Sequence, residues 1–138
     1  MYKKFILILL VLLFSYPSLS EGLTVPATVI SVYDGDTFTI EAETWPGQWV
    51  RKKIRVNGID TPEIRTKCKS EKALGYKARD FAVDLLGEKV ILKNISDGKF
   101  AGRNLADVYL SDGRNFSEIM ISSGLARIYN GGKRSGWC

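Results

Sequence analysis

Two acidic turns of the sequence contain oxygen ligands suited to a metal ion. Asp34 and Asp36 flank Gly35, and Asp60 precedes Thr61 further along the chain. Carboxylates, main-chain carbonyls and water are the ligands that Ca²⁺ prefers. A barrel that brings the two turns together would therefore make a calcium site from Asp36, Asp60 and the carbonyl of Thr61.

A glutamate and two arginines accompany these acids. Glu63 follows Asp60 closely, Arg55 precedes it on a predicted strand, and Arg103 follows Gly102 at the start of a later strand. A carboxylate can activate water, a metal can act as a Lewis acid, and guanidinium groups can bind phosphate oxygens as negative charge builds. The set is suited to the hydrolysis of a phosphodiester.

Both acidic turns also have a purely structural interpretation. The Asp-Gly-Asp sequence at residues 34–36 is typical of a hairpin turn. Thr61, Pro62 and Glu63 would suit the N-cap, first residue and first turn of a helix. Exposed arginines are usually solvated surface residues. The chemistry is therefore indicated by the whole set and not by any one member.

The chain contains no histidine, which narrows the possible chemistry. Catalytic Ser-His-Asp and Cys-His arrangements are excluded, as are zinc sites that need histidine. Hydrolysis would have to use carboxylates, arginines, a lysine or a hard metal ion.

The N-terminus has the pattern of a signal peptide. Two lysines precede an apolar run at residues 5–14, and Ser18 and Ser20 are small residues at positions minus three and minus one of a cleavage site. The run is shorter than the roughly 20 residues that a membrane-spanning helix needs. We expect residues 1–20 to be removed and the mature protein to be secreted or periplasmic, without stable membrane association.

Residues 21–138 are expected to form one domain. The 138-residue chain is 45% hydrophobic and 25% charged, which is typical of a globular protein. Its formal net charge of +5 at pH 7 is compatible with an anionic polymer as partner. In an exported protein the two cysteines, Cys68 and Cys138, are expected to form a disulfide, although two free thiols are an alternative.

The hydrophobic pattern predicts three strands, a helix, two strands and a short final helix. Gly87 is expected to end the first helix, with Ser117 as the N-cap of the second and Gly124 at its end. Five short strands with a helix after the third are the layout of an OB-type β-barrel with helices, an α+β fold that commonly binds oligonucleotides. The strands are expected within residues 24–36, 37–43, 49–59, 89–95 and 104–110, and the helices within residues 70–86 and 116–126.

Four motifs together resemble the staphylococcal nuclease (thermonuclease) family. They are VYDGDTFTI, IRVNGIDTPE, GRNLADVYL and GLARIY, in that order, within residues 28–129. The resemblance implies the OB barrel of that family and a Ca²⁺-dependent endonuclease. Such an enzyme would act as a monomer on DNA and RNA, break the bond to the 5′ oxygen and leave a 3′-phosphate.

The resemblance also implies roles for individual residues. Asp36 and Asp60 match the carboxylates that bind calcium, Thr61 matches the residue that provides a main-chain carbonyl, and Asp34 matches an acid near the metal that is not a direct ligand.

The catalytic groups are assigned in the same way. Glu63 matches the glutamate that acts as general base, while Arg55 and Arg103 match the arginines that bind and polarise the phosphate. Ala101 replaces a tyrosine that contacts the phosphate in the family, and Tyr129 is available either to stack on a base or to pack.

Two alternatives come from other classes of protein. A nucleic-acid-binding module of the same fold could lack catalysis, but the joint presence of Asp36, Asp60, Glu63, Arg55 and Arg103 argues against this. A phosphoesterase that uses another divalent ion is the second alternative.

Overall fold

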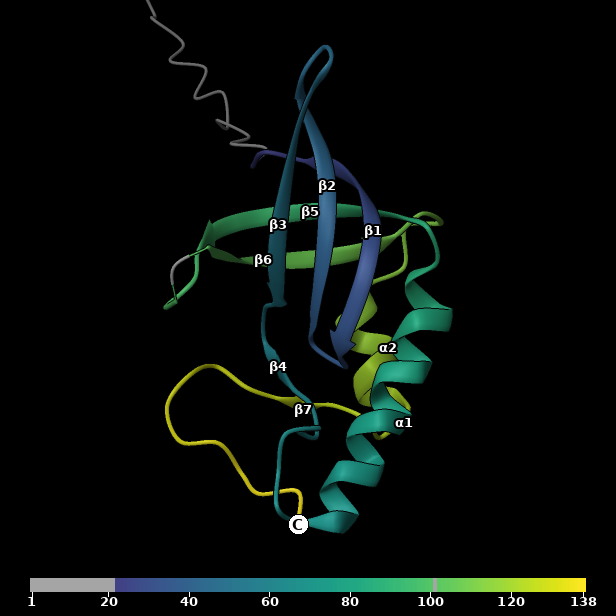
Figure 1. Cartoon of the computed structure of the whole chain (residues 1–138), viewed down its shortest axis with the longest axis vertical. Coiled ribbons are helices and arrows are strands. Elements are labelled where there is room, and N and C mark those ends of the chain that lie inside the picture. Colours follow the sequence, from purple (N-terminus) through teal and green to yellow (C-terminus); the bar gives the residue numbers. More distant parts are fainter. Residues whose placement is uncertain (1–21, 101) are drawn as a thin grey trace, which may run out of the picture.

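A computed structural model describes residues 22–100 and 102–138 and shows a closed five-stranded barrel with two helices (Figure 1). The predicted signal peptide and Ala101 lie outside the described residues. Around the barrel the strand order is β1-β2-β3-β6-β5; β3 and β6 are parallel, and the other pairs are antiparallel. The predicted OB-type α+β barrel is confirmed. Its strands are β1 (Val25–Asp34), β2 (Thr37–Trp45), β3 (Gln48–Val56), β5 (Lys89–Asp97) and β6 (Arg103–Leu110).

Alternation of side chains along the strands forms the core. On β2, Phe38, Ile40 and Ala42 are buried, while their neighbours along the chain are at least partly exposed. Successive side chains of a strand point to opposite faces, so one face fills the barrel and the other meets solvent. The outer face near the β1–β2 turn is therefore free to carry polar groups.

The helix α1 (Lys69–Leu86) packs on β1 through buried Ala78 and Ala82. Gly87 ends it with a φ of 60°, as predicted. The alternative interpretation of Thr61 as a helix N-cap is wrong, because the helix begins only after Cys68. The backbone N–H of Thr61 donates instead to the carboxylate of Asp36, which holds this segment outside the helix.

The second helix, α2 (Phe116–Ser122), begins at a different cap from the predicted one. Asn115 is the N-cap, and its side chain accepts a hydrogen bond of 3.1 Å from the backbone of Glu118. The prediction of Ser117 was wrong; its hydroxyl donates to the carbonyl of Asn57. Gly124 follows the helix with a φ of 78°, which allows the chain to turn back.

The third predicted strand is broken near its end. Gly58 has a φ of 77°, which separates β3 from the short strand β4 (Ile59–Asp60). β4 pairs antiparallel with β7 (Arg127–Ile128), a pair that the sequence did not predict.

The predicted disulfide between Cys68 and Cys138 is present, with the two Cα atoms 6.0 Å apart. The chain after β7 is thereby returned to the start of α1 (Figure 1).

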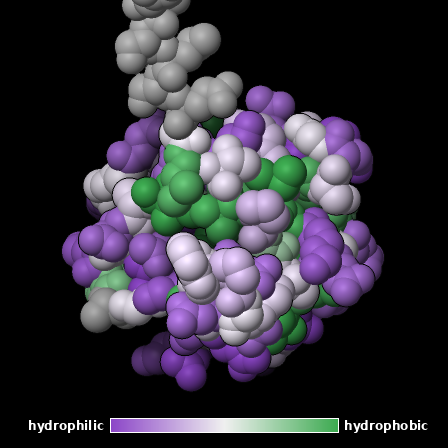
Figure 2. Space-filling view, turned by 90° about the horizontal axis from the view of Figure 1, so that it is seen from above, coloured by the Kyte–Doolittle hydropathy of each residue, from purple (hydrophilic) through white to green (hydrophobic). Residues whose placement is uncertain are grey.

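The β2–β3 hairpin projects beyond the rest of the barrel (Figure 1) and exposes Trp45 and Trp49. Seen from this end, the surface is largely hydrophilic, with hydrophobic side chains showing between the polar ones in several places (Figure 2). No helix within the described residues is long and apolar enough to cross a bilayer.

Candidate active site

The two acidic turns meet, as the sequence predicted. Gly35 allows the β1–β2 turn to approach the chain after β4, because a Cβ atom there would lie 2.9 Å from Cγ2 of Thr61 and 3.0 Å from Cβ of Ala78. Oδ2 of Asp36 accepts a hydrogen bond of 3.1 Å from the backbone of Thr61. Asp36, Asp60 and Thr61 are all buried. Close packing at a glycine thus places one carboxylate beside the second turn.

The side chain of Asp34 is hydrogen-bonded to the backbone of Asp36. Oδ1 of Asp34 accepts a hydrogen bond of 3.1 Å from the amide of Asp36. Burial, together with the neighbouring carboxylate of Asp36, raises the pKa of Asp34 to about 7. The site therefore combines two closely spaced carboxylates in a poorly solvated turn, an arrangement that a nearby cation would stabilise.

Arg55 provides one such cation from β3. Its Nη2 atom lies 3.3 Å from Oδ2 of Asp36 and 4.0 Å from Oδ1 of Asp60, and its side chain is only 14% exposed. Nη1 also donates to the carbonyl of Val56 at 2.8 Å. These contacts fix the guanidinium group at the rim of the acidic turns.

Arg103 lies on the same outer face as Arg55. In the parallel pairing of β3 and β6, Arg55 is opposite Leu105 and Arg103 is opposite Lys53. Because side chains alternate along a strand, residues two apart share a face. The guanidinium carbon of Arg103 lies 4.8 Å from the ring centroid of Phe100, and its buried Nε has no hydrogen-bond partner among the described residues.

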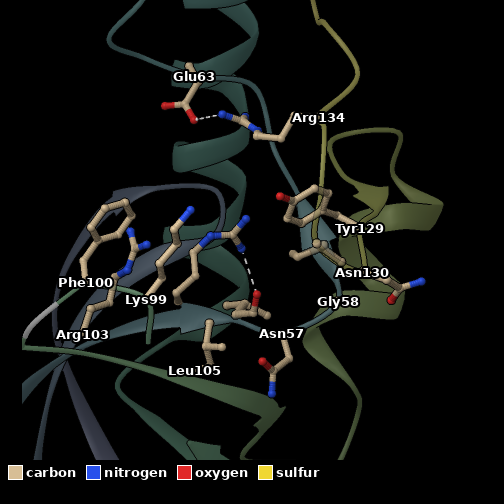
Figure 3. A pocket seen from close by; sticks show the side chains of 14 residues that line it. Asn57, Gly58, Glu63, Lys99, Phe100, Arg103, Leu105, Tyr129, Asn130 and Arg134 are labelled. Carbon is tan, nitrogen blue, oxygen red and sulfur yellow. Dashed lines mark hydrogen bonds and ion pairs between the residues drawn. The ribbon is translucent and has the colours of Figure 1, made fainter. Parts of the chain in front are cut away.

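An open pocket of about 800 Å³ joins these groups to the C-terminal part of the chain. Figure 3 shows Arg103 and Phe100 on one side of it and Glu63 with Arg134 on another. A second pocket of about 670 Å³ includes Asp36 and shares Arg55, Glu63, Phe100 and Arg103 with the first. Cationic groups thus border the space next to the buried acids. That space is suited to binding a phosphate.

Glu63 is partly exposed at the pocket edge and is paired with a residue that the sequence analysis missed. Its Oε1 atom lies 2.6 Å from Nη1 of Arg134 (Figure 3). Nη2 of Arg134 lies 2.6 Å from Oδ1 of Asp60 and donates to the Thr61 carbonyl at 3.3 Å. Burial alone would lower the pKa of Arg134, but the neighbouring carboxylates of Asp60 and Glu63 outweigh burial and raise that pKa above its ordinary value.

Trp137 is a second residue that the sequence analysis missed. Its indole Nε1 donates a hydrogen bond of 3.0 Å to Oδ2 of Asp60. The prediction that Cys138 pairs with Cys68 was the available signal, because it brings the preceding residues close to the segment that contains Glu63.

The oxygen atoms of this site fit a hard divalent cation. Two carboxylates, Asp36 and Asp60, and the Thr61 carbonyl are brought together, and carboxylate and carbonyl oxygens are typical ligands of Ca²⁺. Oδ1 of Asp60 is buried without a hydrogen-bond donor among the described residues, since Arg134 meets it as an ion pair and not in hydrogen-bond geometry. Within residues 22–100 and 102–138, no three acidic or cysteine side chains are grouped so as to hold a metal ion, so main-chain oxygen and water would complete the shell.

Comparison with known proteins places the chain among nuclease relatives. A model of the family described as "Staphylococcal nuclease homologue" matches residues 53–135. An uncharacterized protein of Methanocaldococcus jannaschii is 33% identical over 126 residues, covering 73% of this chain and 58% of the relative. Proteins of Escherichia coli O157:H7 and of Escherichia coli, each named "Uncharacterized endonuclease", are 28% identical over 123 residues, covering 88% of this chain and 71% of each relative. The chain thus spans little more than half the length of the archaeal relative.

Proposed function

This chain belongs to the staphylococcal nuclease homologue family, and from that premise we propose that it is a Ca²⁺-dependent endonuclease that hydrolyses phosphodiester bonds of DNA and RNA. The resemblance found in the four sequence motifs is confirmed by the family match. Two relatives carry the name endonuclease, which supports the reaction class. The observation that supports the proposal most strongly is that Asp36, Arg55 and Arg103 line one pocket, in which Arg55 is ion-paired with Asp36.

In the proposed reaction the two arginines bind the scissile phosphate. Arg55 and Arg103 share the outer face of β3 and β6 and border both pockets. Their guanidinium groups would donate hydrogen bonds to the non-bridging oxygens and stabilise the extra negative charge of the transition state. The ring of Phe100, whose centroid lies 4.8 Å from the guanidinium carbon of Arg103, would help to hold that guanidinium in place.

Glu63 is the proposed general base. Its carboxylate would take a proton from water as the water oxygen attacks phosphorus. The bond to the 5′ oxygen would break, the 5′ oxygen would leave as a hydroxyl after taking a proton from solvent, and a 3′-phosphate would remain. Asp36, Asp60 and the Thr61 carbonyl would hold the calcium ion, which when bound supplies Lewis-acid stabilisation of the phosphate. Asp34 would keep Asp36 in place through its backbone hydrogen bond.

We further propose that the enzyme is exported as a monomer. The signal-like pattern of residues 1–20 supports export, and a disulfide between Cys68 and Cys138 would persist in an oxidising compartment. Mass measurement of the protein recovered from periplasmic and extracellular fractions tests this proposal. A mass that begins near Glu21 supports it, and an uncleaved cytoplasmic chain would contradict it.

The reaction itself is tested with purified mature protein on single-stranded DNA, double-stranded DNA and RNA, in Ca²⁺ and in EGTA. Product ends are examined for a 3′-phosphate. Glu63→Gln is expected to lower kcat by about 10²- to 10⁴-fold, the range for loss of a general base. Glu88→Gln is the matched control because Glu88 is exposed on the loop before β5, away from the pocket residues. Binding without cleavage would favour a nucleic-acid-binding barrel instead.

A further inference from the structure

The C-terminal loop, defined as residues 129–138, is fixed over the candidate site by several independent contacts. The amide of Tyr129 donates to the carbonyl of Gly58 at 2.9 Å, directly after the β4–β7 pair. At its other end, Cys138 is joined to Cys68 by the disulfide. Figure 1 shows this loop, drawn in yellow, leaving β7 and returning to the start of α1.

Arg127, in β7 directly before the loop, provides a further contact with the end of the loop. Its Nη1 donates to the carbonyl of Gly136 at 2.7 Å, and its guanidinium carbon lies 3.8 Å from the ring centroid of Trp137. Trp137 in turn donates to Oδ2 of Asp60. The loop is thus attached to the same aspartate that is proposed to bind the metal.

Arg134 projects from this loop onto three functional groups. Its guanidinium group contacts Oδ1 of Asp60, the carbonyl of Thr61 and Oε1 of Glu63. The first two are oxygens of the proposed calcium shell, and the third belongs to the proposed general base. Arg134 is 38% exposed, whereas the Asp60 side chain that it meets is only 5% exposed. A positive charge is therefore held against a buried carboxylate from the solvent side.

We propose that Arg134 is a tethered cation that competes with Ca²⁺ for Asp60 and the Thr61 carbonyl and so lowers the affinity of the site for the metal. This inference rests on the proposed function. Two cations cannot share the same carboxylate oxygen closely, because their repulsion is strong in a partly buried site. Bound Ca²⁺ displaces the guanidinium from these two oxygens, and Arg134 keeps its ion pair with Glu63 at the pocket edge.

The tether makes this competition effective. A free guanidinium ion would be diluted in solution, whereas Arg134 is kept at a high local concentration by the disulfide and by the Tyr129–Gly58 hydrogen bond. Loosening one end of the loop should therefore weaken the competition without removing the charge. Cys138→Ser does this at the end of the loop that lies closer to Arg134 in sequence.

Trp137 provides a readout of metal binding that does not require activity. Its indole nitrogen lies 3.0 Å from Oδ2 of Asp60, so excitation of this tryptophan should sensitise the luminescence of Tb³⁺, a hard cation used here as a probe of the calcium site. Ca²⁺ is then titrated against bound Tb³⁺, and direct calorimetric titration with Ca²⁺ gives an independent dissociation constant. Folding of each variant is checked by thermal unfolding.

The decisive comparison is between wild type and Arg134→Gln. We expect the Kd for Ca²⁺ to fall by about 10-fold in Arg134→Gln, since a unit charge within contact distance of the shared oxygens is removed. Cys138→Ser should give a smaller fall in the same direction. Arg114→Gln, which removes the same charge from an exposed residue paired with Asp112, should leave the Kd unchanged.

Failure of this inference is distinguishable from failure of the proposed function. An unchanged or higher Kd in a folded Arg134→Gln protein, with measurable Ca²⁺ binding in wild type, would overturn the competition and leave the proposed metal site standing. Metal binding that appears only in Arg134→Gln would support the competition. Absence of Tb³⁺ and Ca²⁺ binding in both proteins would overturn the competition and the calcium site together.

Discussion

The two sides of the candidate active site are held by different kinds of contact. The barrel side consists of Asp36, Arg55 and Arg103, which lie on or next to paired strands. The loop side consists of Glu63 and Arg134, which lie on segments without regular structure. Backbone ladders fix the first set, while the second set depends on ion pairs and a disulfide. The residues of the barrel side should therefore keep their positions in variants whose loop-side residues are no longer held in place.

Removal of the disulfide is the largest expected perturbation. The double substitution of Cys68 and Cys138 by serine should lower the free energy of unfolding by about 4 kcal/mol in the chain-entropy model, because the bridge closes a long loop. Chemical denaturation of the variant and wild type measures the difference.

The same double-serine variant also tests, residue by residue, whether the barrel side and the loop side are held independently. Amide hydrogen exchange should accelerate in residues 127–138 of the folded protein, while β3 and β6 keep their protection. Equal acceleration in the barrel strands would show that the two sides are not independent.

Arg103→Lys breaks the barrel side without changing its charge. A lysine cannot donate two parallel hydrogen bonds from a planar group, so kcat is expected to fall by about 10²-fold. Steady-state kinetics on single-stranded DNA measures this effect, and Arg114→Lys is the matched control on an exposed turn. A wild-type rate in Arg103→Lys would remove Arg103 from the proposed reaction.

Gly35→Ala tests the packing that joins the two acidic turns. The new methyl group would come within 3.0 Å of Thr61 and Ala78, so we expect a loss of about 1–3 kcal/mol in stability from overpacking. Gly136→Ala is the control, since a Cβ atom there meets nothing within 4 Å. Equal stabilities of the two variants in urea denaturation would contradict the close approach at Gly35.

Asn115→Ala should have the smallest effect. Loss of the N-cap hydrogen bond to the amide of Glu118 is expected to lower stability by about 1 kcal/mol. Ser117→Ala, at the cap that the sequence suggested, should change stability less. The reverse order of the two variants in thermal unfolding would restore Ser117 as the cap.

The barrel side was predictable because its residues adjoin strands with a clear alternating pattern. Asp36 follows a tight glycine turn, and Arg55 lies near the end of a strand, between the buried Ile54 and Val56. The order of strands and helices then places the two acidic turns at the same end. The proximity of Asp36, Asp60 and Thr61 could therefore be predicted from the sequence alone.

Of the loop side, the sequence predicted Glu63 but not Arg134. The position of this side depends on contacts that leave no local pattern in the sequence. β4 and β7 contain two residues each, too few to show a hydrophobic period. Glu63 was found by motif, but Arg134 follows two glycines with φ of 93° and 81° in a segment without regular structure. The correct prediction of the disulfide limited where this segment could lie without specifying what Arg134 would touch.

The two helix starts show why local signals can mislead. Thr61 has the residue type and the neighbours of an N-cap, yet its amide is used by Asp36 from the other turn. At α2 the acceptor belongs to Asn115, and Ser117 bonds back to Asn57 instead. In both cases a contact from a distant part of the sequence decided how a polar group was used.

The central claim is that the two sides act together in calcium-dependent hydrolysis of a phosphodiester. Its most direct test is the rate of single-stranded DNA cleavage by wild type and Glu63→Gln, each measured in Ca²⁺ and in EGTA. Cleavage by wild type that requires Ca²⁺ and falls by about 10²-fold or more in Glu63→Gln is the predicted result. Wild-type cleavage that persists in EGTA, or a Glu63→Gln variant as fast as wild type, would contradict the claim.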